Sequence, residues 1–183
     1  MQLNPMFDFS SVPVLTTERL TLRELRLSDA ADVLIFRGDP TVQQYNGPVF
    51  QSVAEVHSLI EELHAAFTAQ NGLTWSVTFQ KQDIVVGLFC LHHWDPYHRR
   101  AEVGYDLARA HWGQGIGSEA LRAIVTFGFE NLNLHRIYAD TIADNHASVR
   151  LLEKLGFHHE GTKRQDSWEE DGTFHDSAMY GLL

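Results

Sequence analysis

Cysteine is nearly absent from this sequence: its 183 residues include one, Cys90, which lies within an apolar run. A single cysteine cannot form a disulfide within the chain, so the composition fits a reducing compartment and favours a buried, unreactive thiol over a nucleophile. Long apolar runs are also lacking, since none approaches the roughly 20 residues that span a bilayer. Residues 1–13 carry neither a basic start nor an apolar stretch, so we expect no signal peptide and a cytoplasmic protein.

Basic residues are scarce as well. Fourteen Lys and Arg stand against 24 Asp and Glu, which gives a formal net charge of −10. Proteins that bind nucleic acids or anionic membranes without specificity need basic patches, so both functions are disfavoured. The charge favours a cationic partner such as an amine or a basic peptide, although solubility alone explains it as well.

Metal-binding spacings are missing despite 11 histidines. The pairs His92–His93 and His158–His159 are adjacent, and adjacent side chains on a strand point to opposite faces. His57 and His64 are two helical turns apart and do not match the i, i+4 spacing of helical zinc ligands. With the only cysteine in an apolar run, we expect no metal.

The main motif of the chain is a glycine-rich turn at residues 112–119, Trp-Gly-Gln-Gly-Ile-Gly-Ser-Glu. A strand-like run precedes it and a helix-like run follows it. Glycines let the backbone approach a ligand closely, and the free N–H groups at a helix start form an anion site. The turn therefore predicts a phosphate or pyrophosphate site, although a tight strand-to-helix connection without a ligand also explains the glycines.

Two well-known phosphate loops do not fit this turn. The dinucleotide fingerprint G-x-G-x-x-G requires glycine where Ser118 stands, and the P-loop requires a lysine that the turn lacks. Backbone N–H groups would therefore do most of the anion binding.

The segment from Leu107 to Ser118 resembles the acetyl-CoA pyrophosphate loop of the GNAT N-acetyltransferase superfamily, with Trp112 where the general pattern has Gln or Arg. Trp-Gly-x-Gly followed by Glu-Ala is similar to one branch, the ribosomal-protein N-terminal acetyltransferases of the Rim type. Other stretches match that branch in the right order: residues 17–23 (TERLTLR), 145–148 (NHAS) and 152–161 (LEKLGFHHEG). The resemblance extends from about residue 15 to the C-terminus.

Hydrophobic periodicity and turn residues predict the secondary structure. We expect helices at 30–37, 52–70, 120–132 and from Asn145 to Gly156, and strands at 20–25, 73–79, 84–91, 101–107, 136–142, 157–163 and 173–182, with a polar loop at 92–100. This order predicts an α/β fold with a mixed sheet flanked by helices, which is the GNAT arrangement. We expect residues 1–14 to form an arm, whose Phe7 and Phe9 can dock on the body of the protein, and residues 15–183 to form one domain.

The resemblance implies that the strand before the loop splays away from the next strand and that acetyl-CoA lies in the cleft. Three sets of residues would hold it: the backbone of Asp106, Leu107 and Ala108 along the pantetheine, the N–H groups of Gly113, Gln114, Gly115, Ile116, Gly117 and Ser118 around the pyrophosphate, and Asn145 on the opposite wall. Helix capping is a second, compatible role for Asn145.

Acetyl transfer needs a donor for the departing thiolate and an acceptor for the amine proton. Many GNAT enzymes place a tyrosine acid where this chain has Leu152. The Rim-type branch offers the serine at Ser148 instead, although a serine in a first helical turn also bonds its own backbone. Glu102 and Asp166 are the candidate bases, and a water relay without a dedicated base is an equal alternative.

The acidic loop that contains Glu169, Glu170 and Asp171 is the candidate for acceptor binding, since clustered carboxylates attract an ammonium group; a solvated hairpin tip explains them equally well. The resemblance implies an acetyl-CoA-dependent N-acetyltransferase, a monomer or homodimer, in which an amine attacks directly in a ternary complex. A protein N-terminal α-amine comes first as acceptor, then a polyamine or an aminoglycoside. The alternatives are a non-catalytic acyl-CoA-binding module and, with less support, a nucleotide-binding domain.

Overall fold

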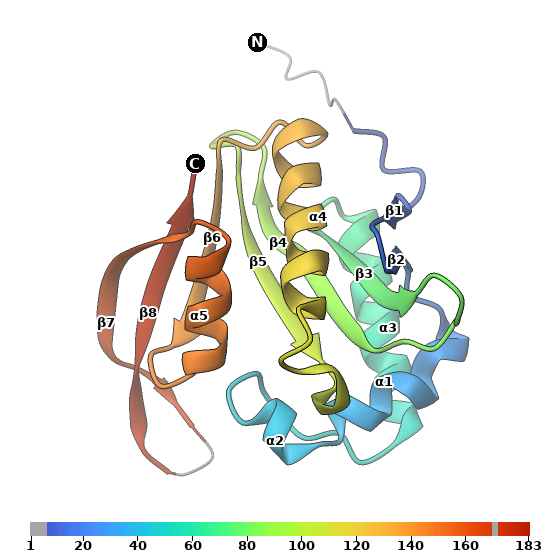
Figure 1. Cartoon of the computed structure of the whole chain (residues 1–183), viewed down its shortest axis with the longest axis horizontal. Helices are drawn as coiled ribbons and strands as arrows, with labels where there is room; N and C mark the ends of the chain where they lie inside the picture. The colour runs from blue at the N-terminus through green and yellow to red at the C-terminus, as the bar shows by residue number, and fades with distance from the viewer. Residues whose placement is uncertain (1–6, 170–171) are drawn as a thin grey trace.

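The computed structural model describes residues 7–169 and 172–183 (Figure 1). Eight strands form one mixed sheet in the order β1-β2-β3-β4-β5-β6-β8-β7. Their bounds are β1 Leu15–Thr16, β2 Leu20–Glu24, β3 Gly72–Phe79, β4 Gly87–Asp95, β5 Arg100–Leu107, β6 Arg136–Ile142, β7 His158–Trp168 and β8 Phe174–Leu182. All neighbouring strands are antiparallel except β5 and β6.

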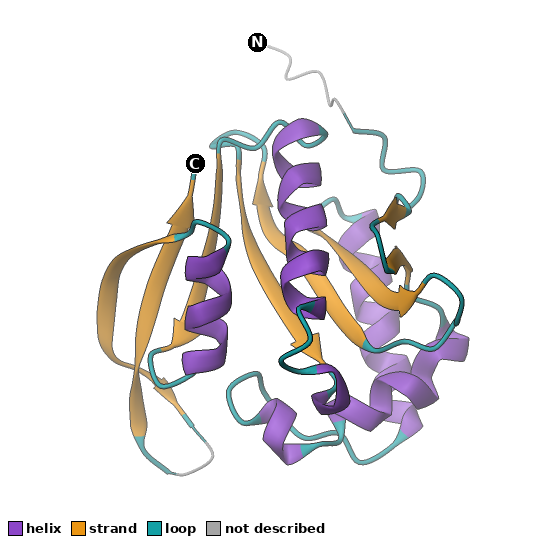
Figure 2. Cartoon of the chain, in the orientation of Figure 1, coloured by secondary structure: helices purple, strands orange, loops and turns teal. Residues whose placement is uncertain are grey.

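Helices cover both faces of this sheet, α4 and α5 on one face and α1 and α3 on the other, and α2 lies beyond the ends of the strands at the bottom of the view (Figures 1 and 2). Their bounds are α1 Ala30–Arg37, α2 Pro40–Gln43, α3 Val53–Thr68, α4 Ile116–Glu130 and α5 His146–Lys154. Each face has its own apolar core. Leu121 and Ile124 of α4 pack with Leu91 of β4, whereas Val33 of α1 and Ile60 of α3 lie in a second cluster.

The parallel strands β5 and β6 pair over a short distance and then separate. Only three positions are in register, Arg100 with Arg136, Ala101 with Ile137 and Glu102 with Tyr138. Beyond Glu102 the remaining residues of β5 pair with β4 alone, and the rest of β6 pairs with β8. This separation opens the sheet between β5 and β6, as expected for the GNAT fold.

Local signals in the sequence explain where the main helices begin and end. Ser52 caps α3, with its hydroxyl accepting a hydrogen bond from the Glu55 N–H, and Asn145 caps α5 in the same way through the Ser148 N–H. Gly156 follows α5 with a φ of +90°, a conformation that glycine adopts without strain.

Most of the predicted elements are confirmed, but two strands extend into predicted loops. The strand predicted at residues 84–91 lies instead at Gly87–Asp95, because His92 and Asp95 pair with Glu102 and Arg100 of β5. Similarly, β7 continues to Trp168, into the acidic segment. In both places polar side chains look like loop residues in sequence, yet they lie on strands that continue past an irregularity in register.

The segment before β1 contacts the body of the protein through aromatic residues. Phe7 meets Phe127 of α4 edge-on, with ring centroids 5.5 Å apart, and Phe9 stacks on Trp94 at 4.9 Å. The docking expected of these two phenylalanines is therefore present. Within the described ranges no helix is long and apolar enough to cross a membrane.

Candidate active site

The opening between β5 and β6 forms two adjoining grooves. The larger has a volume of about 700 Å³ and is bordered by α2, the end of β5, the glycine turn and α5. The smaller, of about 250 Å³, lies between β5, β6 and the β7–β8 hairpin. The two share four lining residues, Tyr45, Asn46, Tyr105 and Ser148. These residues therefore mark the point at which molecules in the two grooves would meet.

The glycine turn borders the larger groove and leads into α4. Gly113 and Gly115 have φ values of 71° and 77°, which explains why the turn requires glycine at both positions. Gly115 is the N-cap, so the first N–H groups of α4 have no partner within the helix and, with the helix dipole, favour an anion. The turn thus has the geometry expected of a phosphate-binding loop.

Side chains outside the turn hold it in place. The Trp112 indole donates a hydrogen bond to the Leu107 carbonyl at 2.7 Å, and Arg19 donates to the Gln114 carbonyl at 3.1 Å. Arg19 also pairs with Glu119 in the first turn of α4 at 2.6 Å. Trp112 thus ties the turn to the end of β5, which gives a physical reason for a tryptophan where the general pattern has Gln or Arg.

The backbone of β5 presents alternate residues to the opening. The Ala108 N–H donates to the Val86 carbonyl at 2.8 Å, so this amide faces the β4 side and is already used. Alternate residues of a strand direct their backbone groups to the same side, so Tyr105 and Leu107 face the opening. Consistent with this, the Tyr105 carbonyl accepts from Asn46 and the Leu107 carbonyl from Trp112. Of the three predicted pantetheine contacts, Leu107 has the suitable orientation.

Asp106 has a structural environment that the sequence does not reveal. Its carboxylate is only 6% exposed and contacts Arg37 Nε at 3.0 Å, Asn46 Nδ2 at 2.6 Å and Gln43 Nε2 at 3.5 Å. The side chain thus joins α1, α2 and the loop after α2 to β5. This network positions Tyr45 and Asn46 at the junction of the grooves.

Ser148 lies at the junction of the two grooves together with a tyrosine. The hydroxyl oxygen of Tyr105 is 2.8 Å from Ser148 Oγ. Burial raises the pKa of Tyr105 to about 12, so its hydroxyl stays protonated at neutral pH. Leu152, where many relatives carry a tyrosine, is fully buried in the core. Sequence reasoning missed Tyr105, which supplies a phenol from β5 rather than from α5.

The candidate bases lie apart from the junction. Glu102 is on β5 and accepts a hydrogen bond from His93 Nδ1 at 2.9 Å, whereas Asp166 is near Lys163, at 3.8 Å. Among the described residues, neither carboxylate lines a groove, but Asp140 and Glu169 both line the smaller one. Of the acidic loop, Glu169 is therefore placed at the site, while Glu170 and Asp171 lie outside the described residues.

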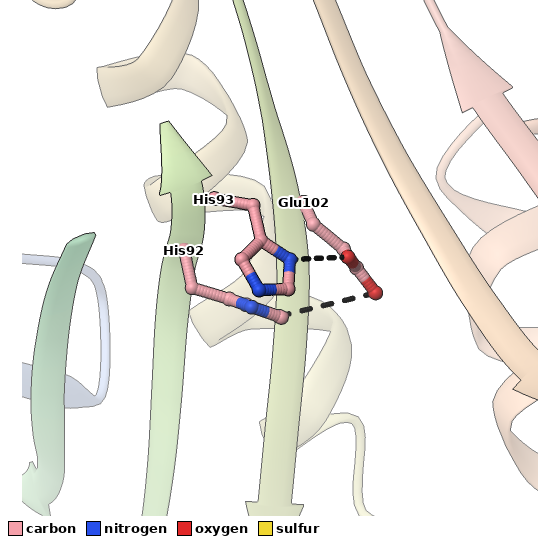
Figure 3. A group of neighbouring side chains, drawn as sticks. All are labelled: His92, His93 and Glu102. Carbon is pink, nitrogen blue, oxygen red and sulfur yellow. Dashed lines mark hydrogen bonds and ion pairs between the residues drawn. The ribbon is translucent and has the colours of Figure 1, made fainter. Parts of the chain in front are cut away.

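The adjacency of His92 and His93 predicted that their side chains point to opposite faces of β4. In the structure they point to the same side. His93 has a φ of 50° and lies where the register between β4 and β5 shifts, so the regular alternation of side chains is broken. The two rings are 4.5 Å apart at their centroids and both are directed toward Glu102 (Figure 3).

Comparisons with known proteins agree with the family and fold expected from the sequence. A family model described as an acetyltransferase (GNAT) domain matches residues 19–158. The uncharacterized N-acetyltransferase YoaA of Bacillus subtilis (strain 168) is 34% identical over 93% of this chain and 97% of its own length. A solved structure of RimL, a ribosomal L7/L12 alpha-N-protein acetyltransferase in complex with coenzyme A, has a TM-score of 0.85 at 22% identity, covering 93% of this chain and 98% of the other. That likeness concerns the fold.

Two further relatives have names that state an acceptor. The ribosomal-protein-serine acetyltransferase of Escherichia coli (strain K12) is 30% identical over 62% of this chain and 63% of its own length. The spermidine N(1)-acetyltransferase of Vibrio cholerae serotype O1 is 29% identical over 78% of this chain and 81% of its own length.

Proposed function

The chain belongs to the GNAT acetyltransferase family and is an N-acetyltransferase, and from this premise we propose that it transfers the acetyl group of acetyl-CoA to a protein N-terminal α-amine. One observation carries the proposal: the Tyr105–Ser148 hydroxyl pair lies at the junction of the two grooves, beside the glycine turn. The amine attacks the thioester directly, with both substrates bound and no acetylated enzyme.

The larger groove suits acetyl-CoA. The N–H groups from Gly113 to Ser118 bind the pyrophosphate at the start of α4, where the helix dipole favours negative charge. Leu107 pairs with the pantetheine through its backbone, and Asn145 borders the arm from the α5 side. This arrangement brings the acetyl group toward Tyr105 and Ser148, while the acceptor enters through the smaller groove.

The hydroxyl pair stabilises the departing thiolate. Burial keeps the Tyr105 hydroxyl protonated, and the two hydroxyl oxygens are 2.8 Å apart. The proposal makes Tyr105 the donor in this hydrogen bond and Ser148 the acceptor, which leaves the serine hydrogen to point at the sulfur. A donor already held in place costs no reorganisation as charge develops on the leaving group. The two hydroxyls therefore do together what a tyrosine on α5 does in many relatives.

Removal of the amine proton is assigned to Glu102, through water. Its side chain is 18% exposed on β5, the strand that also carries Tyr105, and Tyr138 lies opposite it in the parallel register. Asp166 is the second candidate, although its carboxylate is near Lys163. Because neither touches the grooves, one or more waters complete the path to the amine.

The acceptor assignment combines charge with the relatives' names. Two carboxylates, Asp140 and Glu169, line the smaller groove, and the chain has a net charge of −10, so a cationic amine is favoured. The named relatives act on a ribosomal protein and on spermidine. The protein α-amine comes first because the chain carries the Rim-type signature, and a polyamine or an aminoglycoside is the alternative acceptor.

The experiment offers the enzyme acetyl-CoA with one acceptor at a time: a basic peptide with a free N-terminus, the same peptide with a blocked N-terminus, spermidine, and an aminoglycoside. Mass spectrometry locates the acetyl group. We expect acetylation of the α-amine of the free peptide and none of the blocked peptide. Acetylation of spermidine or the aminoglycoside alone would overturn the α-amine assignment.

A further inference from the structure

Three side chains on β4 and β5 form a compact cluster to which the proposed acetyl transfer assigns no joint role (Figure 3). His92, His93 and Glu102 each offer one ligand atom, and these atoms all lie within 4.8 Å of one another. His93 Nδ1 is 2.9 Å from Glu102 Oε2, and His92 Nε2 is 4.0 Å from Glu102 Oε1. The two imidazoles thus share one carboxylate.

Features of the backbone create this cluster. His92 is directly opposite Glu102 in the register of β4 and β5, and the irregularity after His92 turns the following ring to the same side. Gly104 leaves room for the His92 ring, because a Cβ at that position would be 3.3 Å from His92 Nε2. Three separate local features therefore bring the ligand atoms together.

We propose that His92, His93 and Glu102 bind a divalent transition-metal ion of the zinc class. Two imidazoles and one carboxylate are a ligand set that zinc uses when it keeps a fourth position open. Ligand atoms on a tetrahedral zinc are roughly 3.3 Å apart, so the observed separations need only small side-chain rotations. Magnesium and calcium prefer oxygen ligands and do not match two nitrogens.

The surroundings of the cluster support a cation. Arg100 of β5 and Lys163 of β7 are paired with other carboxylates, Asp95 and Asp140. The negative charge of Glu102 is therefore available to a metal. The side chain of His93 is 65% exposed, which gives the ion a path from solvent.

Tyr138 is a supporting residue for the site. It lies directly opposite Glu102 in the parallel register of β5 and β6. A protonated phenol that contacts a ligating carboxylate fixes the orientation of that carboxylate, and losing such a contact commonly weakens metal binding about tenfold or more.

The test uses the full chain without a polyhistidine tag, stripped of metal and titrated with Co²⁺, which shows visible absorption bands in tetrahedral sites. We expect one equivalent to bind and one equivalent of Zn²⁺ to displace it. His93→Ala and Glu102→Gln should weaken binding by about 100-fold or more, Tyr138→Phe by about tenfold, and the exposed His57→Ala, the matched control, not at all.

Binding by His93→Ala and Glu102→Gln equal to the wild type, or no one-to-one binding by a wild-type chain with native circular dichroism, would overturn the proposal. The titration contains neither acetyl-CoA nor an acceptor, so it is independent of the acetylation chemistry.

A consequence for turnover rests on the proposed function, because Glu102 is also the proposed base. A metal that ligates Glu102 occupies the lone pairs that would accept the proton, so one equivalent of Zn²⁺ should lower turnover by about 100-fold, and a chelator should restore it. Full turnover by the zinc-loaded enzyme would contradict the role of Glu102 as base and leave the metal site intact.

Discussion

Tyr105 and Ser148 come from different elements, and each alone has an ordinary structural role. Tyr105 stacks on Phe89 with ring centroids 5.5 Å apart, and Ser148 lies in the first turn of α5. In the proposed mechanism, their 2.8 Å contact makes the two side chains act together as one hydrogen-bond donor for the leaving group. A pair that works as a unit should respond to mutation as a unit.

Replacing either member of the pair should therefore lower kcat by about 100-fold, with little change in the KM for acetyl-CoA, since a positioned proton donor typically contributes at least that much. The double variant Ser148→Ala/Tyr105→Phe should be hardly slower than either single variant. Steady-state kinetics on the four proteins measures this, and CoA affinity by calorimetry serves as the control. If the reductions in kcat of the two single variants multiplied in the double variant, the two hydroxyls would act independently and the claim of a joint donor would be wrong.

The sequence predicted a role for Ser148, which lines both grooves, but gave no sign of Tyr105 beside it, for a physical reason. The serine belongs to a local motif with Asn145, whereas the tyrosine is 43 residues away and meets it only because β5 and α5 border the same groove. The orientation of His93 was missed for a similar reason: a positive φ at a non-glycine residue leaves no signal in the composition of the strand.

Cys90 should be unreactive in the folded protein. Burial raises the pKa of its thiol to about 12, so at neutral pH the folded state holds roughly 1,000-fold less thiolate than the unfolded chain. Alkylation by iodoacetamide should accordingly be slower by about that factor than in denaturant. Rates within tenfold of each other would contradict the burial of this thiol.

The same shift fixes the sign of a pH dependence. Because the folded protein holds the Cys90 proton more tightly, it binds more protons than the unfolded chain above the usual thiol pKa of 9.0. The stabilising contribution is present below pH 9 and is lost as the pH rises toward 12. In chemical denaturation, the free energy of unfolding of Cys90→Ser should depend less on pH between pH 9 and about 12 than that of the wild type.

At the scale of elements, the cleft results from how little of β5 pairs with β6. The elements themselves were largely predictable, because apolar periodicity and capping residues are local signals. The strand extensions at His92 and beyond Lys163 were not, since tertiary pairing overrides the polar composition there. The order and type of the elements could thus be predicted from the sequence, whereas the exact ends of the strands depend on pairing with neighbouring strands.

The groove between α4, α5 and β5 can be tested by filling it. A Cβ at Gly117 would be 3.5 Å from Leu151 and 3.8 Å from Leu107, which are ordinary contacts, so Gly117→Ala should retain CoA binding. Gly117→Trp places an indole in the larger groove and should abolish CoA binding while circular dichroism stays native. Unchanged CoA affinity in Gly117→Trp would remove this groove as the cofactor site.

At the scale of the whole molecule, the net charge of −10 favours cationic acceptors over long distances. Such attraction is screened by salt, so the KM for a basic peptide should rise several-fold between low and physiological ionic strength while kcat stays constant. Glu169→Gln should reduce this dependence of the KM on ionic strength. An uncharged amine serves as the control, and an equal salt response for both acceptors would contradict electrostatic recruitment.

The central claim is direct transfer from acetyl-CoA to an amine at the junction of the two grooves. The measurement that tests it most directly is the initial rate of free-CoA release, with the concentrations of acetyl-CoA and acceptor both varied. The account predicts release that depends on the acceptor and intersecting double-reciprocal lines, as a ternary complex requires. Parallel lines with an acetylated enzyme, or CoA release independent of any amine, would contradict it.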